Sequence, residues 1–584
     1  MKPHRKSWES LAAGKRAATL AKVPDHWRLS DSELSDAKKQ RDLTGSFIRK
    51  FLTEDEIFIT DQNATQIASA IQVGWLTALQ VTEAFCKRAA IAHQINNCLH
   101  EIFFDQAVER AKQLDDYFSQ HNKTCGPLHG VPVSLKDQFH VKGIDTTMGY
   151  VGWIGSNLGV KTPEQSHKVE SQITTELLDL GAVLYCKTSL PQTLLFGETK
   201  NNIIGETLNP LNQNLSCGGS SGGEGALQAL GGSILGVGTD IGGSVRIPAA
   251  FNGIFSIKPT PERISYREVA NTNPGQNTYR STVGFLSTSL DGLELIFRSV
   301  LSTEPWKRDP AVIPMPFRDQ VVDDLLSRAK PNGAAKASAL PLKLGVLWSD
   351  GQVGPHPPVK RGLGMVVDAM KEAGHKACYF RVLPSFTLCF WLLRTSADQA
   401  KRVHVAFLKA DGAHDIHAQL DRSGEPLIPD LRNSFQLKPP IGLLEYQNFT
   451  LQGLDYEAQY SDYWNSTSAE DGQIVDAVIM PVAPHAAVIP GKFYHTDYTE
   501  AMNLLNYSVV VIPVTRADKD VDLVDESYQP LNATDKKNWD AYDPEAYHGG
   551  PVGVQIVGHK YEEEKVWAIA KVVTAALQTF GRQC

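Results

Sequence analysis

Residues 216–260 read SCGGSSGGEGALQALGGSILGVGTDIGGSVRIPAAFNGIFSIKPT, a stretch that carries two serines inside glycine clusters. Ser220 stands in GGSSGG, and Ser244 stands 24 residues further on in DIGGSVR. Glycine clusters suit neither a helix nor a strand interior, because glycine has no side chain to pack and loses more backbone entropy when it is ordered. We therefore expect each cluster to form a loop in which main-chain N–H groups can approach a ligand closely.

A serine at the end of such a loop can attack a carbonyl carbon while neighbouring N–H groups stabilise the oxygen that becomes negative. The N–H groups in question belong to Ile241, Gly242, Gly243 and Ser244. Removal of one such donor typically costs on the order of 3 kcal/mol of transition-state stabilisation. The pattern therefore predicts nucleophilic chemistry at a serine.

The two serine clusters, their spacing and the segment GTDIGGSVRIPAAF together resemble the signature of the amidase signature family. In that family a second serine and a lysine activate the nucleophile, and histidine takes no part. The resemblance implies Ser244 as the nucleophile, Ser220 as the bridging serine, and Lys136 in HGVPVSLKDQF as the base. A lysine accepts a proton only when it is neutral, so its pKa must lie well below the usual value of about 10.4.

The same resemblance implies residues that support this site. Gly219 would be joined to Ser220 by a cis peptide bond, and Ser221 would support the same loop. Asp240 and Arg246 would maintain the shape of the nucleophile loop. These roles come from the resemblance and not from the spacing of the residues.

The resemblance covers about residues 55–575, where NNIIGETLNP, SGEPLIP and AYHGGPVGVQIVG look like fungal acetamidases of the family. Leu194, in KTSLPQTLL, matches a position whose backbone lies beside the substrate in relatives. Residues 385–402, SFTLCFWLLRTSADQAKR, are longer and more apolar than the family pattern. Whether they line a pocket, cover one or reflect a gene-model error is open.

Apolar strand patterns alternate with amphipathic helical patterns along most of the chain. The expected strands lie at 131–136, 341–348, 475–484, 506–514 and 551–558. Helical periodicity runs from Thr60 to Phe85, and further helices are expected at 105–118, 290–301, 360–374 and 564–577. Thr65 and Thr77 are candidate helix N-caps. Alternation of this kind predicts an α/β fold, and the resemblance implies one large domain with a mixed twisted sheet covered by helices on both faces.

We expect residues 1–59 to form a polar, helical N-terminal extension and residues 60–580 to form the amidase domain. Trp8, Leu11 and Leu20 would dock a first helix on the body. The N-terminus lacks the continuous apolar segment of a signal peptide, and no apolar run reaches the 18 residues that predict a membrane span, so we expect a cytoplasmic protein.

Composition excludes several classes of protein. With 42% hydrophobic and 21% charged residues the chain is typical of globular proteins, and a net charge of −8 gives no reason to expect nucleic-acid binding. The eight cysteines form no CxxC pair, so neither a metal site nor a disulfide framework is predicted, and no cofactor is implied.

Four other patterns resemble reactive sites. GGSSGG satisfies G-x-S-x-G, but the preceding NPLNQNLSC is too polar for the buried strand that a nucleophile elbow requires. Ser35 and Lys38 form an S-x-x-K pair without its companion motifs. His414 and His417 lack a third metal ligand, and Cys217 has no histidine partner in its motif.

The resulting hypothesis is an amidohydrolase that cleaves carboxamides through an acyl-serine, with small aliphatic amides such as acetamide favoured. An ammonia-supplying amidotransferase subunit, a fatty-acid or secondary-metabolite amide hydrolase and an inactive binding module are the alternatives. Esters can follow the same oxyanion chemistry. The expected partner is a small-molecule amide, and a homodimer is left open.

Overall fold

The computed structural model describes residues 7–156, 168–329, 340–380, 396–469 and 471–583. They form one large α/β domain built on an 11-stranded sheet with the order β1-β3-β2-β6-β8-β7-β12-β13-β11-β9-β10. The strands are β1 (Leu99–Ile102), β2 (Pro132–Lys136), β3 (Val183–Thr188), β6 (Leu235–Asp240), β7 (Phe255–Lys258), β8 (Thr282–Ser287), β9 (Lys343–Val346), β10 (Lys376–Tyr379), β11 (Ala477–Pro481), β12 (Val509–Arg516) and β13 (Pro551–Val557). A two-stranded sheet of β4 (Lys200–Asn201) and β5 (Gly205–Glu206) lies apart from it.

The large sheet is mixed, as expected. Strand β2 pairs in parallel with β3 and β6, and β9 pairs in parallel with β10 and β11. The other neighbours are antiparallel, and β6 pairs with β8 along its whole length, from Leu235 opposite Ser287 to Asp240 opposite Thr282. All five predicted strand segments contain a strand, and β2 is buried on both of its faces.

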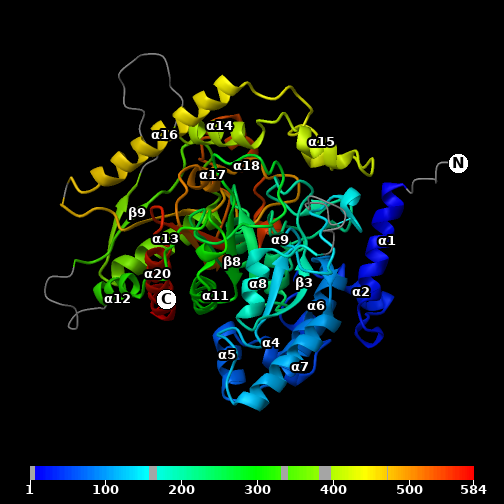
Figure 1. Cartoon of the computed structure of the whole chain (residues 1–584). Coiled ribbons are helices and arrows are strands. Elements are labelled where there is room, and N and C mark those ends of the chain that lie inside the picture. Colours follow the sequence, from blue (N-terminus) through cyan, green and yellow to red (C-terminus); the bar gives the residue numbers. More distant parts are fainter. Residues whose placement is uncertain (1–6, 157–167, 330–339, 381–395, 470, 584) are drawn as a thin grey trace.

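Helices surround the sheet (Figure 1). They are α1 (Trp8–Ala21), α2 (Asp31–Ala37), α3 (Ser46–Arg49), α4 (Glu54–Thr60), α5 (Ala64–Gln72), α6 (Ala78–Asn96), α7 (Phe104–His121), α8 (Gln172–Asp179), α9 (Gly222–Ala229), α10 (Arg246–Asn252), α11 (Leu290–Ser302), α12 (Asp319–Arg328), α13 (Pro357–Glu372), α14 (Ser396–Leu408), α15 (His414–Leu420), α16 (Leu443–Ser466), α17 (Asp497–Leu504), α18 (Ala533–Asp540), α19 (Pro544–Tyr547) and α20 (Glu563–Gln583).

Consecutive residues of β13 show that helices cover both faces of the sheet. A Cβ atom added to Gly362 in α13 would meet the Val552 side chain, whereas one added to Gly553 would meet Ala250 in α10. Neighbouring strand residues point to opposite faces, so α13 and α10 lie on opposite sides of β13. The close approach of both helices depends on these two glycines.

The helix predictions are confirmed at 105–118, 290–301, 360–374 and 564–577, where α7, α11, α13 and α20 lie. The helical periodicity expected from Thr60 to Phe85, with two helix starts, is confirmed by α5 and α6. Thr77 caps α6 as expected, but Thr65 does not cap α5. Asn63 is the N-cap there, because its side chain accepts the Gln66 N–H.

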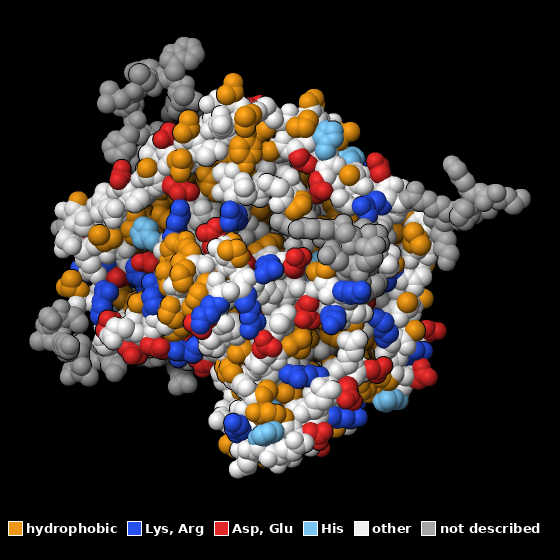
Figure 2. Space-filling model, in the orientation of Figure 1, with side chains coloured by type: hydrophobic (Ala, Val, Ile, Leu, Met, Phe, Trp, Pro, Cys, Tyr) orange, Lys and Arg blue, Asp and Glu red, His pale blue; other side chains and the backbone are white. Residues whose placement is uncertain are grey.

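The N-terminal helices pack against the body of the domain. In α1, Trp8 and Leu11 pack with the buried Ala12, but Leu20 is 43% exposed, so its predicted docking role is wrong. The expected division between residues 59 and 60 falls within α4 and stays a prediction. Among the described residues, no helix is both long and apolar enough to cross a membrane. Figure 2 shows acidic and basic side chains interspersed over one face of the molecule.

Candidate active site

Lys136 ends the buried strand β2, and its side chain has no exposed surface. Its Nζ atom donates to Oγ of Ser220 at 2.7 Å and to Oγ1 of Thr239 at 3.0 Å. Burial lowers the pKa of the Lys136 amine from 10.5 to about 7, although the charges of Asp240 and Glu224 oppose this shift. A substantial neutral fraction near pH 7 gives the amine the lone pair that a base needs.

Ser220 lies in the glycine loop that leads into α9. Its Oγ atom is 2.9 Å from Oγ of Ser244, and the Gly219–Ser220 peptide bond is cis, as the resemblance implied. A Cβ atom at Gly219 would lie 2.6 Å from the carbonyl oxygen of Phe196, so only glycine fits there. The Ser221 N–H donates to the Ser244 carbonyl oxygen at 3.0 Å, which ties the two glycine loops together.

Asp240, at the end of β6, organises the loop that carries Ser244. Its buried carboxylate accepts the N–H groups of Gly243 at 2.9 Å and of Val245 at 3.2 Å, and it forms a bidentate pair with Arg246. Asn503 donates to it at 2.8 Å. Burial opposes ionisation, but the charge and hydrogen bonds of Arg246 lower the pKa of Asp240 to about 2, so the carboxylate is ionised at neutral pH.

The hydrogen-bond partner of the Gly243 N–H differs from the one expected from the sequence. The Gly243 N–H was expected to face a substrate oxygen together with those of Ile241, Gly242 and Ser244. It donates instead to Asp240, so it is occupied by a contact that shapes the loop. Ile241, Gly242 and Ser244 line a cavity, and their N–H groups stay the candidates for oxyanion binding.

The cavity beside Ser244 has a volume of about 350 Å³. Its wall combines apolar side chains with a comparable share of polar and charged ones. Its apolar side chains belong to Leu194, Leu195, Phe196, Ile247, Val405, Leu408, Leu431, Phe435 and Phe493, and its polar side chains to Ser244, Lys401, Lys409, Asp430, Ser434, Thr496 and Glu500. Leu194 lies beside the site as expected, although its own N–H donates to the Pro191 carbonyl oxygen.

The unusual segment 385–402 is described only from residue 396 onward. That part begins α14, and Lys401 lines the cavity together with Val405 and Leu408 from the same helix. Residues 385–395 lie outside the described residues. Helix α14 therefore contributes to the pocket wall, one of the options that the sequence left open.

The site contains residues that sequence reasoning missed. Thr239 contacts Lys136, and its position directly before Asp240 in the signature was an available signal. His404 in α14 and Thr499 in α17 contact the loop of Ser244, but no motif marks them. Their contribution depends on how two distant helices pack.

A buried charged cluster adjoins the cavity. Asp350 contacts His495, whose other ring nitrogen is 3.7 Å from Asp497, and these three side chains have metal-ligand character. The Lys401 ammonium lies 2.7 Å from the Asp497 carboxylate, so a cation of the protein itself already faces the cluster. We interpret it as a network of ion pairs.

The other reactive patterns are not part of the site. Ser35 and Lys38 are exposed on and after α2, and the His417 ring contacts the carbonyl oxygen of Phe435 at 2.9 Å. Burial raises the pKa of the Cys217 thiol, which donates to the Thr207 carbonyl oxygen. No strand directly precedes Ser220, which agrees with the rejection of a nucleophile elbow.

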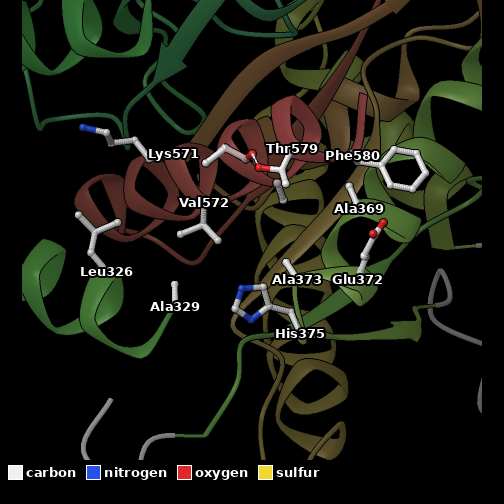
Figure 3. A pocket seen from close by; sticks show the side chains of 12 residues that line it. Leu326, Ala329, Ala369, Glu372, Ala373, His375, Lys571, Val572, Thr579 and Phe580 are labelled. Atoms are coloured by element: carbon white, nitrogen blue, oxygen red, sulfur yellow. Dashed lines mark hydrogen bonds between the residues drawn. The ribbon is translucent and has the colours of Figure 1, made fainter. Parts of the chain in front are cut away.

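A second, larger cavity of about 590 Å³ lies between α12, α13 and α20 (Figure 3). Its wall consists largely of alanine and other apolar side chains. The charged or polar side chains of Glu372, His375 and Lys571 also line it. It shares no lining residue with the cavity of Ser244. Neither Lys136, Ser220 nor Ser244 lines it.

Comparisons with known proteins agree with this geometry. Residues 80–567 match the amidase family. An acetamidase from Emericella nidulans is 41% identical over 97% of this chain and 98% of its own length, and one from Aspergillus oryzae is 41% identical over the same shares. A solved structure of a fatty acid amide hydrolase superposes with a TM-score of 0.86 at 30% identity, covering 98% of this chain and 95% of its own.

The fold and the matched residues define an amide-cleaving hydrolase. The chain belongs to the amidase signature family.

Proposed function

We propose that the protein hydrolyses small aliphatic carboxamides to a carboxylic acid and ammonia through an acyl-Ser244 intermediate. One observation carries this proposal. The side chains of Lys136, Ser220 and Ser244 form a continuous hydrogen-bonded chain, with steps of 2.7 and 2.9 Å, that ends at a cavity.

In the proposed reaction, neutral Lys136 accepts the Ser220 proton while Ser220 accepts the proton of Ser244. Ser244 Oγ then bonds to the carbonyl carbon, and the main-chain N–H groups of Gly242 and neighbouring residues stabilise the resulting oxyanion. The relay runs backward to protonate the nitrogen, and the C–N bond breaks to release ammonia. Water then attacks the acyl carbon, its proton enters the same relay, and the carboxylic acid leaves as Ser244 regains its proton.

The cavity supports a small acyl group. A volume of about 350 Å³ lies at the lower end of the range for ligand pockets, and the side chains of Leu194, Phe196 and Ile247 provide apolar surface for a short aliphatic chain. The two relatives named acetamidase point to the same class of substrate. The neighbour named fatty acid amide hydrolase keeps longer acyl chains as the second candidate.

Two variants and a substrate series test the proposal. Ser244→Ala should abolish turnover, and Ser220→Ala should lower kcat by roughly 10²–10⁴-fold, because the relay to the base is broken. Turnover of amides with acyl groups of graded length should be greatest for short chains. Undiminished activity of Ser244→Ala would contradict the mechanism, whereas a preference for long acyl chains would contradict only the substrate.

Location and assembly belong to the same proposal. We expect the enzyme to act in the cytoplasm without a cofactor, and cell fractionation tests the location. The purified chain should be active alone, because Lys136, Ser220 and Ser244 all lie in it. Dependence of activity on a second subunit would favour the amidotransferase alternative, and size-exclusion chromatography distinguishes a monomer from a homodimer.

A further inference from the structure

We propose that His404 and Thr499 are positioning residues that orient the peptide groups of the Ser244 loop for oxyanion binding. The inference rests on the proposed role of that loop. His404 comes from α14 and Thr499 from α17, two helices that pack against each other. Each side chain contacts a main-chain carbonyl oxygen of the loop.

The two contacts are short and buried. The His404 side chain has no exposed surface, and its Nε2 atom lies 2.7 Å from the carbonyl oxygen of Ile241. Because a carbonyl oxygen only accepts hydrogen bonds, Nε2 must carry the proton. Thr499 Oγ1 donates to the carbonyl oxygen of the next residue, Gly242, at 2.6 Å.

Because a peptide group is planar, holding its carbonyl oxygen also fixes the direction of its N–H group. In a trans peptide, the C=O of one residue and the N–H of the next point in opposite directions. When His404 holds the Ile241 carbonyl, the Gly242 N–H must point away from His404. Gly242 lines the cavity of Ser244, so this peptide is held where its N–H can serve as a donor.

The following peptide is held at both ends. Thr499 binds the Gly242 carbonyl on one side, and Asp240 accepts the Gly243 N–H at 2.9 Å on the other. Glycines have wide conformational freedom, so two consecutive glycine peptides would sample many orientations if nothing held them. The N–H of this second peptide is bound to Asp240, so its role is to restrict the backbone that follows Gly242. The Gly242 N–H, the candidate donor, then does not need to reorganise during the reaction.

Glu500 lies beside the other ring nitrogen of His404, at a distance longer than a hydrogen bond. The Nδ1 atom lies 3.8 Å from Oε2 of Glu500, and Thr496 donates to the other oxygen of that carboxylate at 2.6 Å. Burial would raise the pKa of Glu500, but His404 and the charge of Lys401 lower it to about 2, so Glu500 is ionised.

Two matched pairs of variants test the inference. His404→Gln keeps an N–H donor close to the position of Nε2, whereas His404→Leu fills similar space without one. Thr499→Ser keeps the hydroxyl, whereas Thr499→Val keeps the shape and loses it. We expect His404→Leu to lower kcat by about 100-fold with little change in KM, and His404→Gln to recover most of the loss. Thr499→Val should be clearly slower than Thr499→Ser.

Further readouts separate positioning from stability and from proton transfer. Labelling of Ser244 by a fluorophosphonate should slow in the same order as kcat, while the thermal unfolding midpoints of each pair should agree. The pH profile of His404→Gln should match that of the unmodified enzyme, because the proposed role of His404 is to hold the Ile241 carbonyl and not to transfer a proton. Loss of a limb of that profile would assign His404 to proton transfer and overturn the inference.

Equal kcat values for His404→Leu and His404→Gln would also overturn it, and if His404→Leu does not fold, equal values for Thr499→Val and Thr499→Ser would do so. Ser244→Ala provides the separate control. If Ser244→Ala retains turnover, the proposed function fails. If it is inactive and the paired variants are indistinguishable, only the positioning role fails.

Discussion

The amine of Lys136 lies 2.7 Å from the hydroxyl oxygen of Ser220, and both side chains are buried. A protonated amine can donate to that hydroxyl but cannot take its proton. The ionisation of one buried lysine should therefore control the rate.

This relationship predicts an acid limb in the pH profile. Because burial lowers the pKa of Lys136 to about 7, the neutral form becomes the major one as the pH rises through 7. We expect kcat/KM to rise over that interval and to fall as the pH drops below it. Lys136→Met should lose the limb together with roughly 10²–10⁴-fold of activity. An unchanged limb in Lys136→Met would assign the titration to another group.

The charge of Glu224 should affect the pH at which this acid limb occurs. Its buried carboxylate accepts hydrogen bonds from Ser134 at 2.6 Å and Thr188 at 2.8 Å, and its negative charge raises the pKa of Lys136. Burial raises the pKa of Glu224 itself to about 7, so its charge develops over the same interval as the limb. Glu224→Gln keeps the shape and removes this charge, so we expect the acid limb to move to lower pH. A limb that stays in place or moves upward would contradict this electrostatic coupling.

The pair of Asp240 and Arg246 should contribute strongly to stability. Arg246→Met leaves a buried carboxylate without its main partner, for which we expect a loss of about 3–5 kcal/mol in the free energy of unfolding. Arg280→Met is the matched control, because Arg280 and Glu262 form a pair that is partly exposed and worth at most about 1 kcal/mol. Denaturant unfolding measures both, and similar losses would contradict the prediction.

The sign of the pH effect follows from the pKa of Asp240. It is lowered from 3.8 to about 2 in the folded protein, so its stabilisation is present above pH 3.8 and is lost as the pH falls toward 2. Arg246→Met should weaken this dependence. Unfolding curves collected across that interval would show it.

Phe435 should limit the length of the acyl group. It lines the cavity of Ser244, so Phe435→Ala should shift the preference toward longer amides. Each additional buried methylene is worth about 0.8 kcal/mol, or roughly fourfold in kcat/KM. Phe580→Ala, in the cavity between α12, α13 and α20, should leave the preference unchanged. An identical acyl profile in both variants would remove Phe435 from the specificity determinants.

The sequence predicted the parts of the molecule that depend on local pattern. An apolar strand that ends in Lys136 and helical periodicity are readable along the chain, and the structure has β2 and helices at those places. The cluster GGSSGG forms a loop only as far as Ser221, because Gly222 and Gly223 begin α9. Local reasoning was wrong where neighbours compete. Asn63 rather than Thr65 caps α5, and Leu20 faces solvent instead of the body.

Contacts between distant segments could not be read in this way. The partners of the Ser244 loop include Thr499 and Asn503, which follow it by more than two hundred residues, and His404 from a helix without a motif. Whether the Gly243 N–H faces a substrate or Asp240 depends on the rotamer of Asp240, which a sequence pattern does not predict.

Strand β6 ends with Thr239, which contacts Lys136, and Asp240, which contacts Arg246. Adjacent strand residues face opposite sides, so a slip of one position would exchange the side that contacts Lys136 with the side that contacts Arg246. The pairing of all six residues of β6 with β8 determines which side of the sheet each β6 side chain faces. Insertion of a single residue into β8 should therefore abolish amidase activity, although no side chain of β8 belongs to the proposed catalytic residues.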